Sequence, residues 1–425
     1  MTGDRALSAA RDVPRFAALR VFLCFAFAYF FSALVRGVTA TLAPQFGVEL
    51  GLTAGDLGLL AGAYFLGFAA TQLPLGSALD RIGPRRVLIG LLGLAVLGCA
   101  AFALARSFVA LTLARTLIGV GVSACLMAPM TTFRHRFDDL AQMRANSWML
   151  MTGSMGMVAS TLPVQWLLPM LGWRGLFWAL AGLFVLAIIA IRLNAPADDP
   201  PVAQAAGVAL PGYRDVWRHP TFQRLLPVGF FCYGGLIAMQ SLWVGPWLVQ
   251  VCGWTPAQAA QGLFAVNLAM LLSFLVWGFV VPRLYARGLT AQRLIRWLLP
   301  VSLSGLWLAW LLGPQATTWV WVVFCVGSSV VSLSQPAVGQ AFAAGLAGRA
   351  LSAFNLVIFL GVFAVQWGLG LAIDGFRSIG WDTASAYRGA IALFGGCCAL
   401  SYVWFLCRAD SASTPKTGFT PPNCR

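Results

Sequence analysis

Long apolar segments separated by short polar stretches make up most of this chain. Residues 87–105 run for nineteen positions without a polar side chain, and residues 175–191 run for seventeen. A hydrocarbon core of ~30 Å requires about 20 apolar residues, and lipid cannot satisfy backbone polar groups, so such segments must be helical. The pattern predicts an all-α membrane protein with twelve transmembrane helices, at about residues 20–42, 55–75, 86–105, 110–130, 146–169, 175–193, 224–249, 258–281, 295–313, 318–342, 351–373 and 388–407.

Composition and charge agree with a membrane location. Of the 425 residues 60% are hydrophobic and 10% are charged, whereas soluble domains have about 25% charged residues. The net charge of +15 could indicate a nucleic-acid partner, but most of the 28 Lys and Arg fall in loops and tails on one side. Because basic residues concentrate on the cytoplasmic side, we expect a multi-pass protein of the cytoplasmic (inner) membrane. Both termini are then cytoplasmic, and no nucleic acid is bound. Four arginines lie outside: Arg106, Arg174, Arg377 and Arg388.

An internal repeat divides the predicted helices six and six. Gly-x-Thr precedes the second span at residues 51–53 and the eighth at 253–255, an offset of 202 residues. Thr53 with Asp56, and Thr255 with Gln258, have the spacing of a helix capping box. At the other end of the same spans, Gly76, Arg81 and Arg85 correspond to Gly278, Arg283 and Arg287 at the same offset. Duplicated units of this kind are typical of parallel-repeat transporters.

A polar stretch between the sixth and seventh spans separates the two copies. It contains Pro and Asp residues followed by arginines, which are typical of a linker. We therefore expect two pseudo-symmetric six-helix bundles, at residues 1–193 and 224–425, joined by a cytoplasmic linker at 194–223. The second bundle ends in a short cytoplasmic tail.

The hairpin between the second and third spans carries a dense charge motif, Gly76-Ser-Ala-Leu-Asp80-Arg81-Ile-Gly83-Pro-Arg85-Arg86. It resembles the loop signature of the major facilitator superfamily of secondary transporters. The resemblance implies that Asp80, Arg81 and Arg85 form a latch, closed while the transporter faces outward, in which the acid faces the start of a helix in the other half. A carboxylate near a helix N-terminus gains roughly 0.3–1 kcal/mol. Alternatively, the charges only anchor the topology. The motif residues are Gly76, Asp80, Arg81, Gly83 and Arg85.

Arg115 begins a second motif in the fourth span, Arg115-Thr-Leu-Ile-Gly119-Val-Gly121. It resembles the Arg-x-x-x-Gly-x-Gly element of the same superfamily, which implies a role for the arginine in coupling. The alternative is that Arg115 extends to the lipid headgroups, as long cationic side chains do near the ends of spans.

Arg36, in the first span, is the leading candidate for substrate binding. An arginine at the centre of a transmembrane helix costs roughly 2.5–3.5 kcal/mol, so it indicates function. Tyr29, Ser32 and Thr39 share its helical face, and no span offers an acidic partner near it. An unpaired guanidinium can bind an anion, and the segment resembles the first span of organic-anion transporters, in which an arginine precedes an apolar run ending in Ala-Pro. Alternatively, Arg36 reaches the outer headgroups.

Polar side chains in other spans could complete a site. They are Tyr233, Gln240 and Trp243 in the seventh span and Ser332 and Gln335 in the tenth. Hydrogen bonding between helices explains them equally well. Met151 and Met155, four residues apart, could bind a soft cation such as Cu(I), although methionine often serves only for packing.

The chemistry of the spans argues against an enzyme. No glutamate lies in any span, and the chain shows no paired carboxylates, catalytic triad, phosphate loop, cofactor motif or metal motif. We expect a monomeric secondary transporter that moves a small carboxylate-like anion by alternating access, in contact with membrane lipid. A proton could drive it, with Asp374 as a candidate carrier, although Asp374 could also simply end its helix. The alternatives are a copper importer using Met151 and Met155, or a receptor on the same scaffold.

Overall fold

The computed structural model describes residues 15–198 and 213–408, and these residues fold into helices connected by short turns. The helices of the first part are α2 Arg15–Leu50, α3 Ala54–Ile82, α4 Pro84–Leu104, α5 Phe108–Val122, α6 Met127–Arg136, α7 Asp139–Ala159 and α8 Leu162–Asn194. The second part starts with the short α9 Tyr213–Arg218. It continues with α10 Pro220–Pro227, η1 Val228–Tyr233, α11 Gly234–Ala238, η2 Met239–Trp243, α12 Val244–Gln250, α13 Pro256–Ala286, α14 Ala291–Leu312, η3 Gly313–Gln315, α15 Thr318–Ser328, η4 Ser329–Leu333, α16 Ser334–Gln340, α17 Ala344–Ser378 and α18 Thr383–Cys407.

The predicted spans correspond closely to these helices. Within the described residues, eleven helices or continuous helical runs are long and apolar enough to cross a membrane. The fifth predicted span, 146–169, falls on α7 and the first part of α8. Gly172, at φ 61° and ψ 172°, separates that part from the remainder of α8, which is the sixth span. The expectation of an all-α membrane fold is therefore confirmed.

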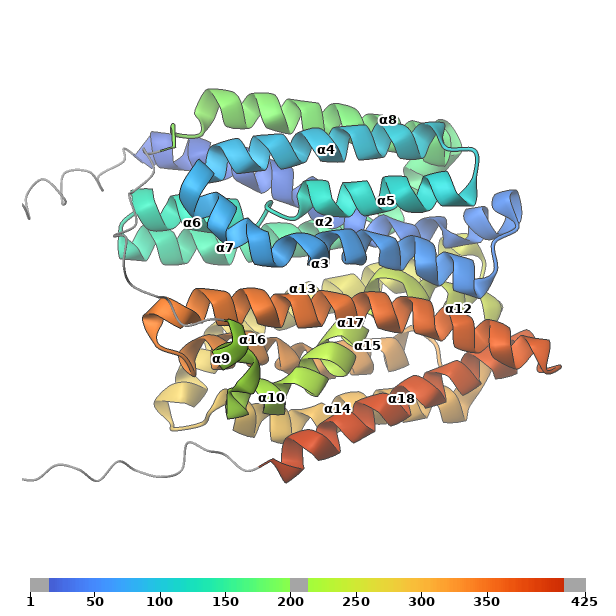
Figure 1. The fold of residues 1–425 in the computed structure, drawn as a ribbon. Helices are drawn as coiled ribbons and strands as arrows, with labels where there is room; N and C mark the ends of the chain where they lie inside the picture. Colours follow the sequence, from blue (N-terminus) through green and yellow to red (C-terminus); the bar gives the residue numbers. More distant parts are fainter. Residues whose placement is uncertain (1–14, 199–212, 409–425) are drawn as a thin grey trace, which may run out of the picture.

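The helices form two groups that lie side by side. In Figure 1, α2–α8 occupy the upper half of the molecule and α9–α18 the lower half. We call these groups the N-half and the C-half. The start of α2 and the end of α18 lie at the same end of the molecule, which we call the terminal end; the loops at 51–53 and 379–382 lie at the opposite end, the far end. Residues 199–212 of the predicted linker lie outside the described residues, so the proposed domain limits stay a prediction.

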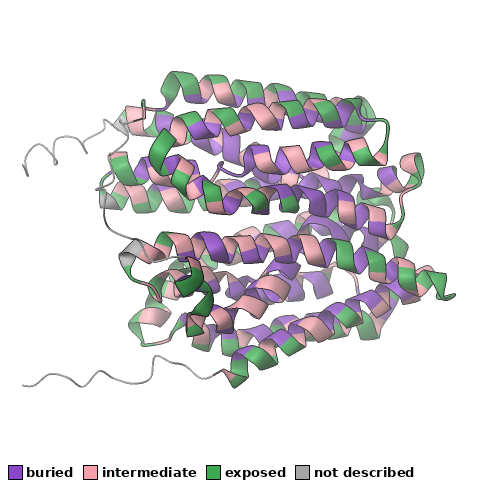
Figure 2. Ribbon diagram, viewed as in Figure 1, coloured by how far each residue is buried: buried purple, intermediate pink, exposed green. Residues whose placement is uncertain are grey.

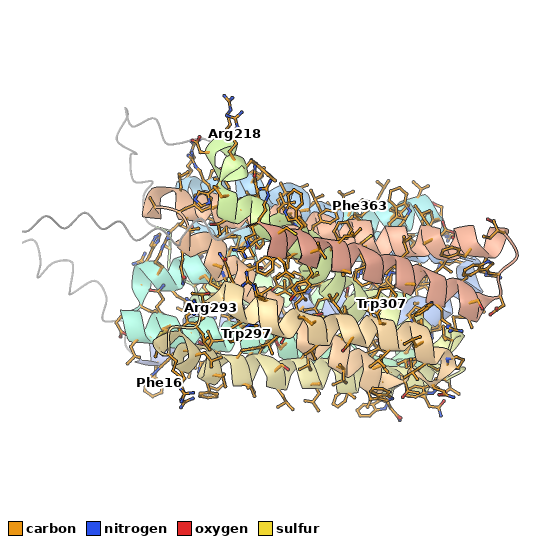
Figure 3. The ribbon with its side chains drawn as sticks, turned by 90° about the horizontal axis from the view of Figure 1, so that it is seen from below. Phe16, Arg218, Arg293, Trp297, Trp307 and Phe363 are labelled. Atoms are coloured by element: carbon orange, nitrogen blue, oxygen red, sulfur yellow. The ribbon has the colours of Figure 1, made fainter. Side chains whose placement is uncertain are left out.

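Buried and exposed residues are arranged as a bilayer requires. Figure 2 shows buried residues mainly where helices face one another and exposed residues on the outer surfaces. Large apolar side chains project outward, including Phe16 (83% exposed), Trp297 (58%) and Trp307 (38%). In Figure 3 Arg218 and Arg293 lie toward the terminal end. An apolar outer surface of this kind suits contact with lipid tails.

The second span of each repeat copy begins with the same local structure. The Thr53 hydroxyl accepts a hydrogen bond from Asp56 N, and the Asp56 carboxylate accepts one from Thr53 N, at the start of α3. Thr255 and Gln258 make the same pair of bonds at the start of α13. Both predicted capping boxes are confirmed. Each satisfies amide groups that a helix start leaves without partners.

The longest interface between the halves is formed by α3 and α17. In addition, α2 contacts η2 and α12, and α7 contacts α13. Glycines allow the α3–α17 interface to close. A Cβ added at Gly58 would lie 2.3 Å from the Gln366 carbonyl oxygen, and one at Gly370 would lie 2.3 Å from the Ala54 carbonyl oxygen. Small residues at membrane helix interfaces permit such close backbone approach. These positions hold the halves together tightly toward the far end.

Candidate functional site

Arg36 lies between the halves, among phenol groups from three helical segments. Its guanidinium interacts with Tyr29 on α2, Tyr64 on α3 and Tyr233 on η1. Its Nε is buried and has no hydrogen-bond partner among the described residues. No Asp or Glu side chain of the described residues forms an ion pair with Arg36. The Arg36 side chain therefore lies inside the bundle, and its Nε–H group is available to donate a hydrogen bond.

The position of Tyr29 is set by a glycine on the neighbouring helix. A Cβ at Gly153 of α7 would lie 2.5 Å from Tyr29 Cε1 and 2.8 Å from the Tyr29 hydroxyl oxygen. Because Gly153 has no side chain, the Tyr29 ring can lie directly against α7. This packing holds its hydroxyl close to Arg36.

Arg115 forms a second buried cation on the other side of Tyr64. The residue is 1% exposed, and its guanidinium carbon lies 5.1 Å from the centre of the Tyr64 ring. Its Nη2 donates to Thr39 Oγ1 and, at 3.5 Å, to the carbonyl oxygen of Arg36. Arg115 thus braces α2 and α3 where they hold Arg36 and Tyr64, rather than extending to the headgroups. Its role in coupling stays a prediction.

Other predicted α2 residues face a different neighbour. Ser32 is 4% exposed, its carbonyl oxygen lies 3.5 Å from the Tyr64 hydroxyl, and its own hydroxyl interacts with the Cys125 thiol. Thr39 contacts Arg115. Thus Tyr29 joins Arg36, whereas Ser32 and Thr39 pack toward α3 and the α5–α6 region.

Tyr233 and Gln240 occupy widened turns of the seventh span. η1 and η2 are π-helical segments that end at Tyr233 and contain Gln240, respectively, and such segments occur frequently at functional sites. Gln240 Nε2 donates to Asn267 Oδ1 of α13 at 2.9 Å. The structure brings Tyr233 to Arg36 and places Gln240 in an amide pair with α13.

The remaining predicted residues bond mainly within the C-half. Trp243 is 2% exposed, and its Nε1 donates to the Gln366 carbonyl oxygen at 3.1 Å. Ser332 donates to the Ser329 carbonyl oxygen within its own helix. Gln335 donates to Asn355 on α17, and both are partly exposed. Their roles in substrate binding stay predictions.

Tyr64 was missed by the sequence reasoning, although it contacts Arg115 and lies near enough to Arg36 for an electrostatic interaction. It lies in an apolar segment between Ala63 and Phe65. The available signal was the same one that identified Tyr29, a hydroxyl in the middle of a membrane span.

The backbone of the hairpin binds the carboxylate of Asp198, a residue that lies outside the motif. Asp198, after α8, accepts hydrogen bonds from Arg85 N at 2.9 Å and Arg86 N at 3.0 Å, at the start of α4. Gly83 has φ 101°, and a Cβ there would lie 2.3 Å from Asp198 Cγ. Arg85 Nη2 also donates to the Arg192 carbonyl oxygen at 2.6 Å. The arginines at 85 and 86 are therefore engaged with the end of the sixth span.

The other charged hairpin residues, Asp80 and Arg81, have no partner within the described part of the chain. Asp80 and Arg81 are exposed and form no hydrogen bond or ion pair with any residue of the described ranges. A Cβ at Gly76 would lie 3.9 Å from Ser352 Oγ of α17, so α3 and α17 still pass near each other here. The predicted latch stays a prediction, and its acid is unengaged here.

The methionine pair gains no support as a metal site. Met155 is 51% exposed on α7. Among the described residues, no group of three or more His, Cys, Asp or Glu side chains could hold a metal ion.

Comparison with known proteins identifies the family. The profile described as Major Facilitator Superfamily matches residues 25–366. The chain belongs to the major facilitator superfamily. A multidrug resistance protein of Salmonella typhimurium, MdtM, is 27% identical over 309 residues, covering 71% of each chain. The probable sulfoacetate transporter SauU of Cupriavidus necator is 25% identical and covers 61% of this chain and 64% of its own.

Other matches cover less of the sequence or show the fold alone. A probable L-galactonate transporter of Escherichia coli is 29% identical over 135 residues, 30% of this chain and 28% of its own. The inward-facing, unoccupied structure of a bacterial homologue of Spinster has a TM-score of 0.74 at 16% identity and covers 92% of this chain and 97% of its own. A D-xylose–proton symporter has a TM-score of 0.72 at 14% identity, with coverages of 93% and 98%. This major facilitator chain is therefore a transporter with the corresponding helical fold.

Proposed function

We propose that this protein moves a small organic anion, carboxylate-like in chemistry, across the cytoplasmic membrane by alternating access. The observation that carries the proposal is the group of Arg36, Tyr29, Tyr64 and Tyr233. Arg36 lies between the halves, with a buried nitrogen that has no partner among the described residues. A charge within the membrane is costly, and a carboxylate can accept two parallel hydrogen bonds from a guanidinium. The phenol hydroxyls can donate further bonds to the same anion.

The substrates named for two relatives support an anionic substrate. Sulfoacetate and L-galactonate, named for two of them, are organic anions. MdtM is named for multidrug resistance, so drugs belong among the compounds tested. The exposed Met155 gives copper import no comparable support, and two of the relatives are named as transporters rather than as receptors or enzymes.

The arginine distribution supports a topology for the proposed cycle. We place the terminal end on the cytoplasmic side, because the arginine-rich hairpin between α3 and α4 lies there, as do Arg218 and Arg293 (Figures 1 and 3), and positive charge favours that side. The far end then faces outward. The protein would work as a monomer, and a proton is the coupling ion that we would test first, as the D-xylose–proton symporter shares the fold.

The decisive experiment combines binding with flux. Purified protein is screened by thermal shift against carboxylates, sulfonates, sugar acids, drugs and Cu(I), since a ligand of the folded state raises the melting temperature. The stabilising compound is then tested for uptake into proteoliposomes. Flux separates a transporter from a receptor, and a pH gradient reveals proton coupling.

Arg36→Gln is expected to abolish uptake at substrate concentrations below the wild-type KM, while the protein inserts normally. Loss of a hydrogen-bonded charge pair is worth about 1.5–3 kcal/mol, or about 10- to 100-fold in affinity. Arg36→Lys keeps the charge but loses the planar fork, so it should retain part of the binding. Arg106→Gln, which removes an exposed arginine in a loop, is the control. Uptake unchanged in Arg36→Gln, or stabilisation only by cations, would overturn the anion proposal.

A further inference from the structure

Asp374, near the end of α17, bonds to the start of a helix in the other half. Its Oδ2 accepts a hydrogen bond from Gly55 N at 2.7 Å, and its Oδ1 accepts one from Ala54 N at 3.2 Å. Both amides belong to the first turn of α3, where N–H groups lack partners within the helix. The negative carboxylate also suits the positive end of the helix dipole. This polar contact joins the N-half to the C-half at the far end.

Asp374 is not needed to begin α3. The start of this helix already has its own capping box, in which Thr53 and Asp56 exchange hydrogen bonds within the N-half. Asp374 adds a second acid that serves the amides of Ala54 and Gly55. Its effect is therefore on the contact between the halves more than on the helix itself.

The antiparallel packing of α3 and α17 places a second acid, Asp80, near the start of α17 at the terminal end. The two helices pack side by side and run in opposite directions, so each begins beside the end of the other. Asp80 lies near the end of α3, as Asp374 lies near the end of α17. The start of α17 has Ala343 as its N-cap residue and no side-chain cap, and Asp80 forms no hydrogen bond in the described part of the chain. Among the described residues, Asp374 is therefore hydrogen-bonded to the other half and Asp80 is not.

We propose that Asp374 is the gating residue of the far end. Its contact with the start of α3 holds the halves closed on that side and breaks when that side opens, in alternation with the Asp80 latch at the terminal end. This inference rests on the alternating-access part of the proposed function and is independent of the substrate.

A cavity beside the contact is consistent with this role. It has a volume of about 280 Å³ at the far end, and both halves line it. Its walls include Thr53, Ala54 and Leu57 from the N-half and Ile373, Arg377 and Tyr387 from the C-half. Because its walls come from both halves, separation of the halves would widen it into an outward-facing entrance.

Distance measurements between the halves test the proposal directly. Spin labels on Val48→Cys in α2 and Ile379→Cys after α17, positions that are 90% and 68% exposed, report on the far end. The protein also carries Cys252→Ser, Cys397→Ser, Cys407→Ser and Cys424→Ser, so that no partly or fully exposed native cysteine takes the label. Asp374→Ala should raise the ratio of open to closed distances roughly three- to tenfold, as expected for loss of a helix-capping carboxylate. Asp374→Asn, which keeps an acceptor, should give a smaller shift and serves if the alanine variant does not fold. Asp80→Ala should shift the ratio the opposite way.

Asp56→Ala is the matched control, because it removes an acid from the same helix start within one half. It should lower the melting temperature without changing the distances. The proposal is overturned if both Asp374 variants leave the distances unchanged, or if Asp56→Ala shifts them as much as Asp374→Ala. A far-end distance that is identical in the wild type and in every variant, Asp80→Ala included, would refute both the gate and the alternating-access cycle on which it rests. Distances that respond to Asp80→Ala but not to Asp374 substitution would refute only the gate.

Discussion

Gly119→Ala tests whether the motif that starts at Arg115 is a packing element that positions the central cation. A Cβ at Gly119 would lie 1.9 Å from the carbonyl oxygen of Tyr64. An ordinary contact requires at least 3.4 Å, so α3 and α5 must separate locally by about 1.5 Å. The clashing atom is backbone, so no side-chain rotation can relieve the contact.

The expected cost follows from two opposing terms. Forcing extra volume into a packed interface costs about 1–3 kcal/mol, whereas alanine is better than glycine in a helix by about 1 kcal/mol. Gly93→Ala on α4 is the matched control, because a Cβ there meets nothing within 4 Å and only the favourable term applies. The two variants should therefore differ in stability by about 1–3 kcal/mol, because both gain the helix term and only Gly119→Ala clashes.

Thermal unfolding in detergent, at one scan rate because unfolding of such proteins is often irreversible, measures this difference. Gly119→Ala should melt below the wild type and Gly93→Ala at or above it. Transport by Gly119→Ala should also fall at temperatures where the protein is folded, because separating α5 from α3 lengthens the 5.1 Å contact between Arg115 and Tyr64. A Gly119→Ala protein that melts with the control would refute the close packing on which this reasoning depends.

Two further substitutions probe the site and the hairpin. Gly153→Ala should displace the Tyr29 ring, which lies 2.5 Å from the new Cβ, and so raise the KM for uptake while changing the melting temperature little; an unchanged KM would show that Tyr29 does not support Arg36. Asp198→Ala should lower stability by about 1 kcal/mol, the usual cost of losing a helix cap, because the amides of Arg85 and Arg86 lose their acceptor. Asp198→Asn keeps an acceptor and should melt closer to the wild type; equal melting of all three proteins would contradict the capping role.

Local features of this fold could be predicted from the sequence because local physics sets them. Helices were expected wherever an apolar run was long enough to cross a bilayer, and the starts of α3 and α13 were expected because Thr53 and Thr255 precede a suitable partner by three residues. The inward orientation of Arg36 followed from the cost of exposing a cation to lipid.

The partners of these residues could not be predicted, because they are distant in sequence. Asp198 is 113 residues from Arg85, and Asp374 is 319 residues from Gly55. No periodicity connects such positions, and the acids look like ordinary linker or helix-end residues. The π-helical turns at Tyr233 and Gln240 were also missed, because an apolar segment looks the same whichever helical hydrogen-bond pattern it adopts.

A single helix links the features that the proposed cycle requires. The start of α3 receives Asp374, its middle presents Tyr64 to Arg36 and Arg115, and its end carries Asp80. Arg36 and Tyr64 both belong to the N-half, so a separation of the halves that frees Asp374 moves them together relative to Tyr233 of the C-half. An anion bound at Arg36 would therefore favour whichever arrangement of the halves lets it bond to groups from both, and by that preference it would favour one gate over the other.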